Sequence, residues 1–446
     1  MDTSRLNWLA AADAARAIRD GAISAEELVE SCLARVRKVD RDVQAWSFLD
    51  PEHALNQARE LDERRREGRP AGPLHGIPVG IKDIIDTADM PTECGTVLHA
   101  GRVPLADAAL VSRLREAEAV IMGKTVTTEL ATYAPGKTRN PHNTQHTPGG
   151  SSSGSAAAVA SGMVPLAVGT QTNGSVIRPA AYCGVFGFKP THGLISRHGV
   201  LSQSRWLDQV GVFARSVEDL ALIAEQLIGF DENDPDTRPV ARPPLLATAM
   251  QEPPLPPRLA FIKSPVWDRA ESETREAFAE LVEHIGETVE EFPLSDDFGR
   301  AIEWHRTIME ADIARSFHAE YENGADRLSA SLRGQIERGR RVLAVDYNRA
   351  LDAIPALNRT LNELFEQRYD AIITPAAMGT APQGLESTGD PIFCTLWTLT
   401  GMPAINLPIM RGGNGLPLGA QLVGPRHGDA RLLRTARWLA AEAAGD

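Results

Sequence analysis

Residues 148–184 read PGGSSSGSAAAVASGMVPLAVGTQTNGSVIRPAAYCG, and this stretch predicts the centre of the fold. It contains two Gly-Ser turns, the first at 149–151 and the second at 174–175. Between them, small residues predict a closely packed helix over 153–162, and an apolar run predicts a strand over 163–172. Glycine permits sharp turns that aim backbone N–H groups at one point, so both turns can serve a reacting centre.

A second segment, GIPVGIKD at 76–83, predicts a buried strand that carries a lysine. Ile77, Val79 and Ile81 alternate along it and share one face, whereas Lys82 points to the other face, toward a second layer. Taken alone, such a lysine is more often a surface side chain that extends to solvent. Lysine is scarce in this chain, however, so a lysine inside an apolar strand is unusual here.

Lys82, Ser151 and Ser175 can together form a catalytic relay. A serine hydroxyl is a weak nucleophile near pH 7, so it needs a neighbouring base, and the base needs a partner that orients it. A neutral lysine behind a bridging serine supplies both requirements. This function requires Lys82 to be desolvated enough to lose its proton.

Further motifs extend this pattern along the chain. The pattern GGSS-x-G-S is followed by G-T-x-T-x-G-S, and the surrounding match runs from about Gly76 to Arg215. It resumes at YDAIITPAA (369–377) and continues through LWTLTGMPAINLPI (396–409) to GLPLGAQLVG (415–424). In these motifs the chain resembles the amidase signature family. Within that family, the motifs GTQTxGSVIRPAAYCG and LWTLTGMPAINLP most resemble those of malonamidase.

The resemblance implies an α/β fold in which helices cover both faces of a large mixed central sheet. It implies a single amidase domain over 1–446, with a catalytic core at about 70–220 and 368–440. The segment at about 231–367 is expected to be more variable and helical, and to shape the substrate entrance or a subunit contact. The Pro-rich run at 231–257 is expected to be a long surface connection.

The same resemblance implies the roles of the site residues. Ser175 attacks an amide carbonyl, Ser151 relays its proton after a cis peptide bond, and Lys82 is the ultimate base. Ser152 is expected to donate a hydrogen bond that positions Lys82 or Ser151. The oxyanion hole is expected to consist of the backbone N–H groups of Thr172, Asn173, Gly174 and Ser175.

Three positions depart from the commonest pattern of the family. Asn173 replaces a glycine, which is compatible with a left-handed turn because Asn tolerates positive φ. Gln171 replaces an Asp and so removes a charge from the pocket floor. Arg178 lies three residues after Ser175 instead of two, so it can share a helical face with the nucleophile. It is therefore expected to clamp the carboxylate of a malonamate-type substrate, or else to pair with a protein acid and brace the turn.

The same residues allow other interpretations. Gly150 to Gly154 also satisfies the G-x-S-x-G elbow of α/β-hydrolase esterases, with Ser152 as nucleophile and Asp390 and His427 as partners, but the segment before it is loop-like. The Ser-rich run could be a linker by composition alone. An amidase subunit that feeds ammonia to an amidotransferase partner remains an alternative. A family member without activity could also serve as a scaffold or binding protein, but the intact residues Lys82, Ser151 and Ser175 argue against that role.

Two weaker motifs give little support for a phosphate-binding loop or a metal site. Gly123-Lys124-Thr125 resembles the end of a P-loop, but Glu118 stands where that loop needs glycine. His142 and His146 are four residues apart in a Pro- and Asn-rich loop without a third ligand nearby, so no metal site is predicted. No cofactor is expected.

Local patterns predict several more elements. VIMG at 120–123 is expected to form a short buried strand, and TTELATYA at 127–134 is expected to start a helix. ESETREAFAELVEHIG at 271–286 is expected to be helical. The stretch from about 300 to 368 is helical and charged, with no catalytic pattern.

Composition limits the classes of partner. The net charge of −13 repels phosphate backbones and anionic lipids, so neither nucleic acid nor a membrane is expected as a partner. The four cysteines are widely spaced, which fits packing residues in a reducing compartment, and a cytoplasmic location is the default. The expected partner is a small amide substrate, and a homodimer is left open.

Overall fold

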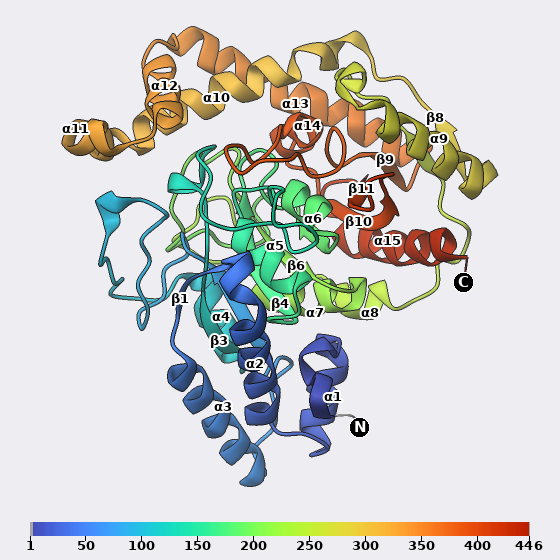
Figure 1. The fold of residues 1–446 in the computed structure, drawn as a ribbon. Coiled ribbons are helices and arrows are strands. Elements are labelled where there is room, and N and C mark those ends of the chain that lie inside the picture. Colours follow the sequence, from blue (N-terminus) through green and yellow to red (C-terminus); the bar gives the residue numbers. More distant parts are fainter. Residues whose placement is uncertain (1–2, 446) are drawn as a thin grey trace.

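The computed structural model describes residues 3–445, and one mixed sheet of eleven strands lies at its centre (Figure 1). The strand order across the sheet is β1-β3-β2-β4-β6-β5-β10-β11-β9-β7-β8. The strands are β1 (Trp46–Leu49), β2 (Pro78–Lys82), β3 (Val120–Thr125), β4 (Leu166–Gln171), β5 (Phe186–Lys189), β6 (Gln209–Ala214), β7 (Leu259–Phe261), β8 (Val289–Glu291), β9 (Ala371–Pro375), β10 (Ala404–Arg411) and β11 (Pro417–Val423).

Parallel and antiparallel neighbours are both present in this sheet. β2 runs parallel to β3 and β4, and β7 runs parallel to β8 and β9. The other neighbouring pairs are antiparallel. Parallel neighbours need crossover connections, and helices supply them here.

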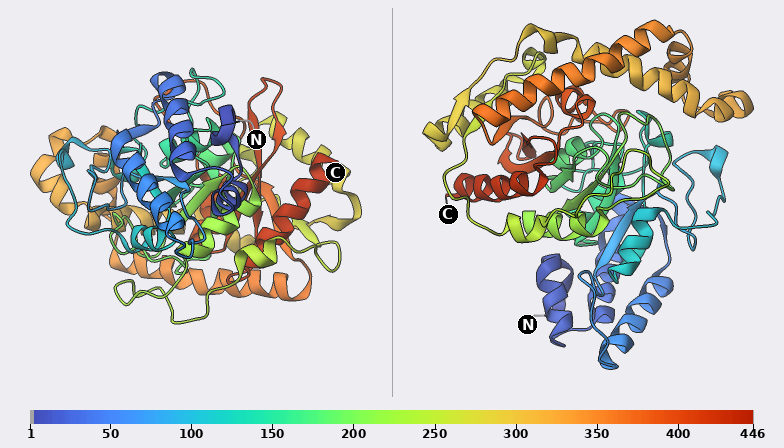
Figure 2. Two further views of the ribbon diagram at one scale, coloured as in Figure 1. Left: turned by 90° about the horizontal axis from the view of Figure 1, so that it is seen from below. Right: turned by 180° about the vertical axis from the view of Figure 1, so that it is seen from behind.

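The helices lie on both faces of the sheet and at its ends (Figure 1 and Figure 2). The expected α/β architecture is therefore confirmed. The helices are α1 (Ala11–Arg19), α2 (Ala25–Val43), α3 (Pro51–Arg66), α4 (Ala109–Glu116), α5 (Ser153–Ala160), α6 (Ile177–Cys183), α7 (Val217–Leu227), α8 (Leu245–Ala249), α9 (Ser272–Ile285), α10 (Ala301–Ser316), α11 (His318–Gly324), α12 (Ala330–Gly339), α13 (Ala344–Gln367), α14 (Ile392–Leu399) and α15 (Asp429–Ala444).

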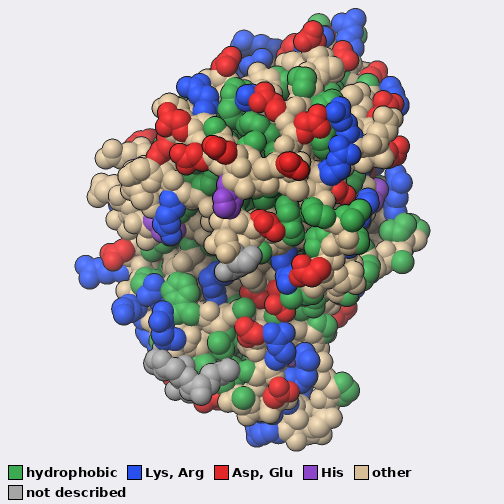
Figure 3. Space-filling view, turned by 90° about the vertical axis from the view of Figure 1, so that its right-hand side faces the viewer, with side chains coloured by type: hydrophobic (Ala, Val, Ile, Leu, Met, Phe, Trp, Pro, Cys, Tyr) green, Lys and Arg blue, Asp and Glu red, His purple; other side chains and the backbone are tan. Residues whose placement is uncertain are grey.

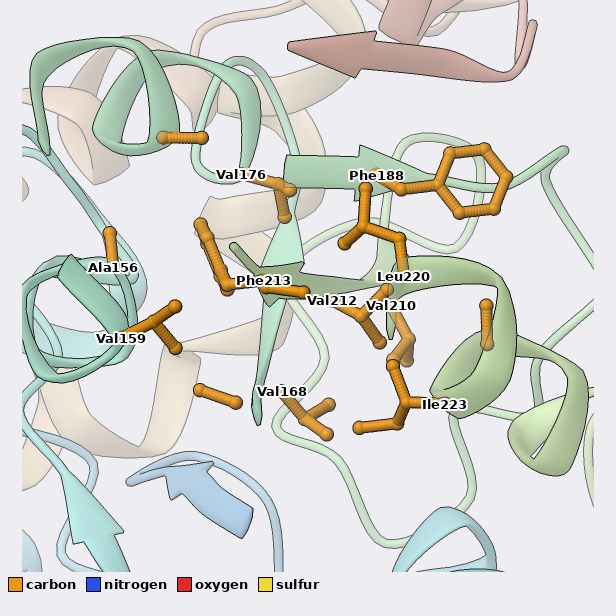
Figure 4. Packing of buried hydrophobic residues seen from close by; sticks show 14 of the residues in the cluster. Ala156, Val159, Val168, Val176, Phe188, Val210, Val212, Phe213, Leu220 and Ile223 are labelled. Carbon is orange, nitrogen blue, oxygen red and sulfur yellow. The ribbon is translucent and has the colours of Figure 1, made fainter. Parts of the chain in front are cut away.

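The alternation of side chains along β6 shows how the layers are built (Figure 4). Val210 and Val212 point toward Leu220 of α7, whereas Phe213 points toward Val159 of α5. All of β6 is buried, as a strand covered on both faces must be. The helices on the two faces therefore hold the strand that lies between β4 and β5.

Close backbone approach explains two of the glycines in the central layer. A Cβ on Gly154 of α5 would overlap the backbone O of Ala45 and the backbone N of Val126. A Cβ on Gly169 of β4 would lie 2.6 Å from Ser152 Oγ. Only glycine permits these contacts, so α5 can pack directly against the backbone of its neighbours.

The helical region at 231–367 contributes a separate layer. α10 contacts α12, α13 and α14. In Figure 1 and Figure 2, α10, α12 and α13 cross the molecule on the side of α14, and α1–α3 lie at the other end. The Pro-rich connection at 231–257 is interrupted by the short helix α8. This layer therefore lies beside the C-terminal part of the sheet.

The surface carries charges of both signs. On the face shown in Figure 3, Lys and Arg side chains are interspersed with Asp and Glu side chains. Mixed signs of this kind give that face no field of a single sign. Within residues 3–445, no helix is long and apolar enough to cross a bilayer.

Candidate active site

Lys82 is the last residue of β2, and its side chain is fully buried. Its Nζ lies 2.7 Å from Ser151 Oγ and 2.8 Å from Thr170 Oγ1. Burial lowers the pKa of Lys82 well below its ordinary value, and the charge of Asp208 opposes that shift. This setting favours the neutral amine more than an exposed position does.

Two other lysines are also fully buried, and their surroundings differ from those of Lys82. Lys124 Nζ donates to the backbone carbonyl of Ile85 at 2.7 Å and to the hydroxyls of Thr87 and Thr92, and it lies 3.9 Å from Asp83 Oδ1. Lys189 Nζ donates to Gln209 Oε1 at 2.5 Å and to the backbone carbonyl of Met402. Burial lowers the pKa of Lys124 to about 8 and that of Lys189 to about 7. Carbonyl and carboxylate oxygens can only accept, so they favour the ammonium form, whereas both described partners of Lys82 are hydroxyls, which can also donate to a neutral amine.

The serines of the run 151–155 use their hydroxyls in different ways. Ser153 Oγ and Ser155 Oγ donate to backbone carbonyls at 2.7 and 3.0 Å. Ser152 Oγ donates to Thr170 O at 3.1 Å and accepts from Thr170 N at 3.2 Å. Ser151 is the member of this run whose hydroxyl contacts a lysine amine. The peptide bond between Gly150 and Ser151 is cis.

Ser152 occupies a different place from the one expected. Within the described residues it forms no hydrogen bond with Lys82 or Ser151; its partner is the backbone of Thr170. The physical reason is that Ser152 precedes the first residue of α5 and faces β4, where Gly169 makes room for its hydroxyl. Its influence on Lys82 therefore passes through Thr170, whose side chain contacts the amine.

The esterase interpretation of Ser152 is wrong on geometry. A nucleophile elbow needs a strand immediately before the serine, but the preceding strand, β3, ends at Thr125 and a long loop follows. Asp390 forms an ion pair with Arg269 at 3.1 Å, and His427 lines a separate cavity. Neither residue forms a hydrogen bond with Ser152 in the described part of the chain.

Ser175 lies between β4 and α6. The exposed fraction rises from 0% for Lys82 through 2% for Ser151 to 9% for Ser175, so Ser175 is the most accessible of the three. In residues 3–445, no hydrogen bond joins Ser175 Oγ to Ser151 Oγ. The structure therefore brings Lys82 and Ser151 into contact, and Ser175 is the more exposed of the two candidate serines.

The turn that carries Ser175 keeps several backbone donors free. Gln171 Oε1 accepts from the N–H groups of Val176 and Ile177 at 2.8 and 3.0 Å, and Gln171 Nε2 donates to Thr398 Oγ1 at 2.9 Å. Among the described hydrogen bonds of turns and loops, none uses the N–H groups of 173–175 as donors. The amide of Gln171 thus fixes the start of α6, and the N–H groups before it stay available.

Asn173 is held by three side chains. Its Nδ2 donates to Tyr133 Oη at 3.1 Å, Thr395 Oγ1 donates to its Oδ1 at 2.7 Å, and Thr398 Oγ1 donates to its carbonyl at 2.5 Å. Asn173 is not among the residues with positive φ, so the left-handed turn with which an asparagine is compatible does not form at this position. The side chain makes cross-links to α14 and Tyr133 that a glycine could not make.

Thr172 is tied to two other parts of the fold. Its Oγ1 donates to Asp208 Oδ1 at 2.7 Å, and its carbonyl accepts from His305 Nε2 at 2.9 Å. Burial lowers the pKa of His305 to about 4, so the ring is neutral near pH 7 with its proton on Nε2. Burial raises the pKa of Asp208 to about 6. The helical region at 231–367 therefore contacts the nucleophile turn through His305 of α10.

Arg178 is buried, with 2% of it exposed. Its Nη2 donates to Gly150 O at 2.7 Å and to Thr388 Oγ1 at 3.1 Å. Its Nε and Nη1 are buried without a hydrogen-bond partner, and the described residues include no acid that pairs with it. Arg178 therefore links α6 to the backbone before Ser151 and to Thr388. α6 begins at Ile177, two residues after Ser175.

A cavity of about 280 Å³ reaches this region from the surface. Thr170, Thr172 and Asp208 line it together with Arg197 and Arg205. The side chain of Arg205 is exposed, whereas Thr170 contacts Lys82. The cavity therefore borders Thr170 and Thr172, which contact the site, although Lys82, Ser151 and Ser175 are not among its lining residues.

Several residues of the site were missed in the sequence. Thr395 and Thr398 are three residues apart on α14 and both contact Asn173, so their helical spacing was a usable signal. Tyr133 and His305 had no such signal, because their contacts join segments far apart in the chain. His142 and His146 bind backbone carbonyls, and residues 3–445 contain no His, Cys, Asp and Glu cluster suited to a metal.

Comparisons of the sequence and of the structure with known proteins indicate the same family. The family profile for Amidase matches residues 27–433. The chain is 36% identical to a glutamyl-tRNA(Gln) amidotransferase subunit of Symbiobacterium thermophilum over 469 aligned positions, which cover 96% of this chain and 95% of that protein.

Solved structures of amidases share the whole fold. The native peptide amidase of Stenotrophomonas maltophilia superimposes with a TM-score of 0.85 and 28% identity, over 97% of this chain and 96% of that chain. A chain of an inhibitor-bound vestigial complex, described as revealing the origins of an s-triazine catabolic enzyme, has a TM-score of 0.91 and 27% identity, over 98% and 99% of the two chains. The protein therefore belongs to the amidase family of hydrolases, which act on carbon–nitrogen amide bonds.

Proposed function

We propose that the protein hydrolyses a small amide through an acyl-serine intermediate, with Ser175 as nucleophile, Ser151 as relay and Lys82 as base. The observation that carries this proposal is the buried Lys82 Nζ at 2.7 Å from Ser151 Oγ. Both described partners of this lysine are hydroxyls, which are compatible with a neutral amine, whereas Lys124 and Lys189 also contact oxygens that can only accept.

In the first step the lone pair of the Lys82 amine accepts the proton of Ser151, whose oxygen accepts the proton of Ser175. The Ser175 oxygen attacks the amide carbonyl carbon as its proton leaves. The carbonyl electron pair moves to oxygen and forms an oxyanion, and Lys82 becomes an ammonium. Burial makes that ammonium costly, which favours the return of its proton in the next step.

The oxyanion is stabilised by backbone N–H groups of the turn at Thr172, Asn173, Gly174 and Ser175. Support comes from Gln171, which occupies the N–H groups of the next two residues and leaves those of 173–175 free. Donors that are already oriented stabilise developing charge without reorganisation. Thr398 and His305 hold the carbonyls of this turn and so keep its N–H groups directed away from them.

Collapse of the intermediate releases the amine. The Lys82 proton returns through Ser151 to the leaving nitrogen, the C–N bond breaks, and the acyl group stays on Ser175. Water then loses a proton to the same relay and attacks the acyl carbon. The ester bond breaks, Ser175 regains its proton, and the carboxylic acid leaves. No cofactor enters these steps.

The substrate class is proposed to be a short carboxy-amide of the malonamate type. Arg178 supports this proposal because its Nε and Nη1 are buried without partners, three residues from the nucleophile. Nε and Nη1 of this guanidinium can each donate one charge-assisted hydrogen bond to a carboxylate. Its third nitrogen, Nη2, is already occupied by Gly150 O, which fixes the orientation of the group.

Arg178→Ala is expected to weaken kcat/KM for a malonamate-type acid by about 30- to 4,000-fold, as loss of a buried charged contact costs about 2 to 5 kcal/mol. The methyl ester of the same compound should lose much less, since it has no carboxylate to bind. Steady-state ammonia release from both substrates in both proteins measures the difference. Thr388→Val, which removes a partner of Arg178 but keeps its charge, is the matched control; equal losses for acid and ester in Arg178→Ala would show a bracing role alone.

The chemistry itself is tested with a fluorophosphonate, which forms a covalent bond with an activated serine. Peptide mass mapping is expected to place the adduct on Ser175. Lys82→Ala should label much more slowly, because the hydroxyl is then unactivated. An adduct on Ser152 would contradict the proposed nucleophile.

A second candidate function follows from the relatives. The chain matches subunits of glutamyl-tRNA(Gln) amidotransferases over nearly its full length. The alternative proposal is that it supplies ammonia to a partner protein. Ammonia release by the isolated chain at a rate unchanged by cell extract supports the free hydrolase. Co-purification of a second protein that is needed for turnover supports the amidotransferase role.

A further inference from the structure

A second cavity, of about 900 Å³, lies apart from the relay residues. Its walls include the connection at 228–243, the helix α13, the end of α14 with the residues after it, the turn at 192–194 and the loop at 426–429 that follows β11. Lys82, Ser151 and Ser175 are not among its lining residues. The cavity is therefore a separate site, and the proposed amide chemistry does not use it.

Two arginines face this cavity without an acidic partner. Neither Arg238 nor Arg426 forms an ion pair in the part of the chain that the structure describes. Arg426 Nε is buried and has no hydrogen-bond partner. Burial lowers the pKa of Arg426, the neighbouring charge of Arg238 lowers it further, and the charge of Asp429 opposes the shift. An anion between the two guanidiniums would relieve both the repulsion and the missing hydrogen bonds.

Three carboxylates line the cavity. Asp236 pairs with Arg197 at 2.5 Å and with Arg205 at 3.0 Å. Asp429 accepts hydrogen bonds from the N–H and the hydroxyl of Thr191 at 2.8 and 2.7 Å. Asp352 of α13 is exposed and forms no ion pair among the described residues. No carboxylate therefore forms an ion pair with Arg238 or Arg426 in the described part of the chain. His192 adds no charge near pH 7, because burial lowers its pKa to about 4.

The opposite wall, on α13, combines an apolar surface with one buried polar group. Leu351 and Ile354 line the cavity there, and Leu399 at the end of α14 continues the apolar surface. Asn358 is 8% exposed, and its Oδ1 is buried without a hydrogen-bond partner. A buried amide oxygen of this kind requires a donor, which a ligand can provide.

The loop that carries Arg426 is held in place before any ligand binds. His427 adopts a left-handed conformation with φ of 63°, and its N–H donates to Thr191 Oγ1 at 2.9 Å. Gly428 N donates to Pro425 O at 2.9 Å and closes a turn around Arg426. A guanidinium on a fixed loop loses little freedom on binding, which favours affinity.

From these observations we infer that the second cavity binds an organic anion. Its oxyanion, a carboxylate or a phosphate, lies between Arg238 and Arg426. Its apolar body packs against Leu351 and Ile354 of α13, and a hydroxyl or N–H of the ligand donates to Asn358 Oδ1. This inference does not depend on the proposed substrate, because none of the relay residues lines the second cavity.

Isothermal titration calorimetry with 4-hydroxybenzoate and 4-hydroxyphenyl phosphate tests the inference, and 4-hydroxybenzyl alcohol is the neutral probe. At least one of the two anions is expected to bind the wild type at millimolar or lower concentration, and the neutral probe at least about tenfold more weakly. Whichever anion binds more tightly identifies the preferred headgroup. Absence of binding by both anions up to about 10 mM would overturn the inference.

Variants locate the binding. Arg426→Gln is expected to weaken anion binding by about 10- to 150-fold, since a hydrogen bond to a charged group is lost. Arg178→Ala, which removes a buried arginine of the relay region, should leave the affinity unchanged. Arg426 forms no described hydrogen bond through its side chain, so its replacement should preserve the melting temperature. Equal weakening in the two variants, or equal affinity for neutral and anionic probes, would overturn the inference.

Discussion

Ser175→Ala is expected to abolish turnover, with a loss in kcat on the order of 10⁴-fold or more, because no other hydroxyl can form the acyl intermediate. Ser152→Ala is the matched control, since it also removes one hydroxyl from a Gly-rich turn. This variant should lower kcat only about tenfold, which corresponds to the loss of a hydrogen bond to the backbone of Thr170, the residue that supports Lys82. Ammonia release from a panel of small amides measures both losses.

Both variants should remain folded, which a thermal melt checks. The Ser175 hydroxyl forms no hydrogen bond among the described residues, so its loss should leave the melting temperature near that of the wild type. Ser152 is fully buried and hydrogen-bonded, so its variant should melt at a lower temperature. The reverse order of activities, with Ser152→Ala inactive and Ser175→Ala active, would contradict the assignment of the nucleophile.

The local elements of the catalytic layer were predictable because their signals are short in range. The alternation around Lys82 predicted β2, and the small residues of 153–162 predicted α5. The run at 163–172 predicted β4. Propensity and periodicity act over a few residues, so such elements can be read one segment at a time.

The segment 127–134 shows where local reasoning fails. It was expected to begin a helix, but the structure has a 3₁₀ turn at Glu129–Ala131, in which Leu130 and Ala131 have positive φ. Long-range contacts explain the difference: Leu130 O accepts from Gln203 Nε2 at 2.7 Å. Tertiary contacts of this kind override a weak local preference.

In the candidate site, too, some features were predictable from local motifs and others were not. Motif context was sufficient to select Lys82, Ser151 and Ser175 as candidates, although it could not show how their side chains meet. The partner of Ser152 depends on the absence of a side chain at Gly169 in another strand. The contact of His305 with Thr172 joins positions far apart in the chain. Neither contact has a local sequence pattern, so both required the folded structure.

Lys82→Ala is expected to lower kcat by about 10²- to 10⁴-fold, the usual contribution of a general base, and by more if Ser151 also loses its orientation. In the wild type, kcat/KM should rise with pH through the Lys82 pKa, because the ammonium form cannot accept the Ser151 proton. Burial lowers that pKa well below its ordinary value, so the rise should come at a lower pH than for an exposed lysine. Lys263→Ala, at an exposed surface lysine, is the control and should change neither rate nor profile.

A second ionisation can overlap with that of Lys82, and the same variant separates the two. Burial raises the pKa of Asp208 to about 6, and its carboxylate holds Thr172 of the nucleophile turn. The residual activity of Lys82→Ala should keep an ionisation near pH 6 and lose the one that belongs to the lysine. Near-normal kcat in Lys82→Ala, or an unchanged pH profile, would contradict the relay. Lys82 would then be a structural lysine like Lys124, and its contact with Ser151 would serve the fold alone.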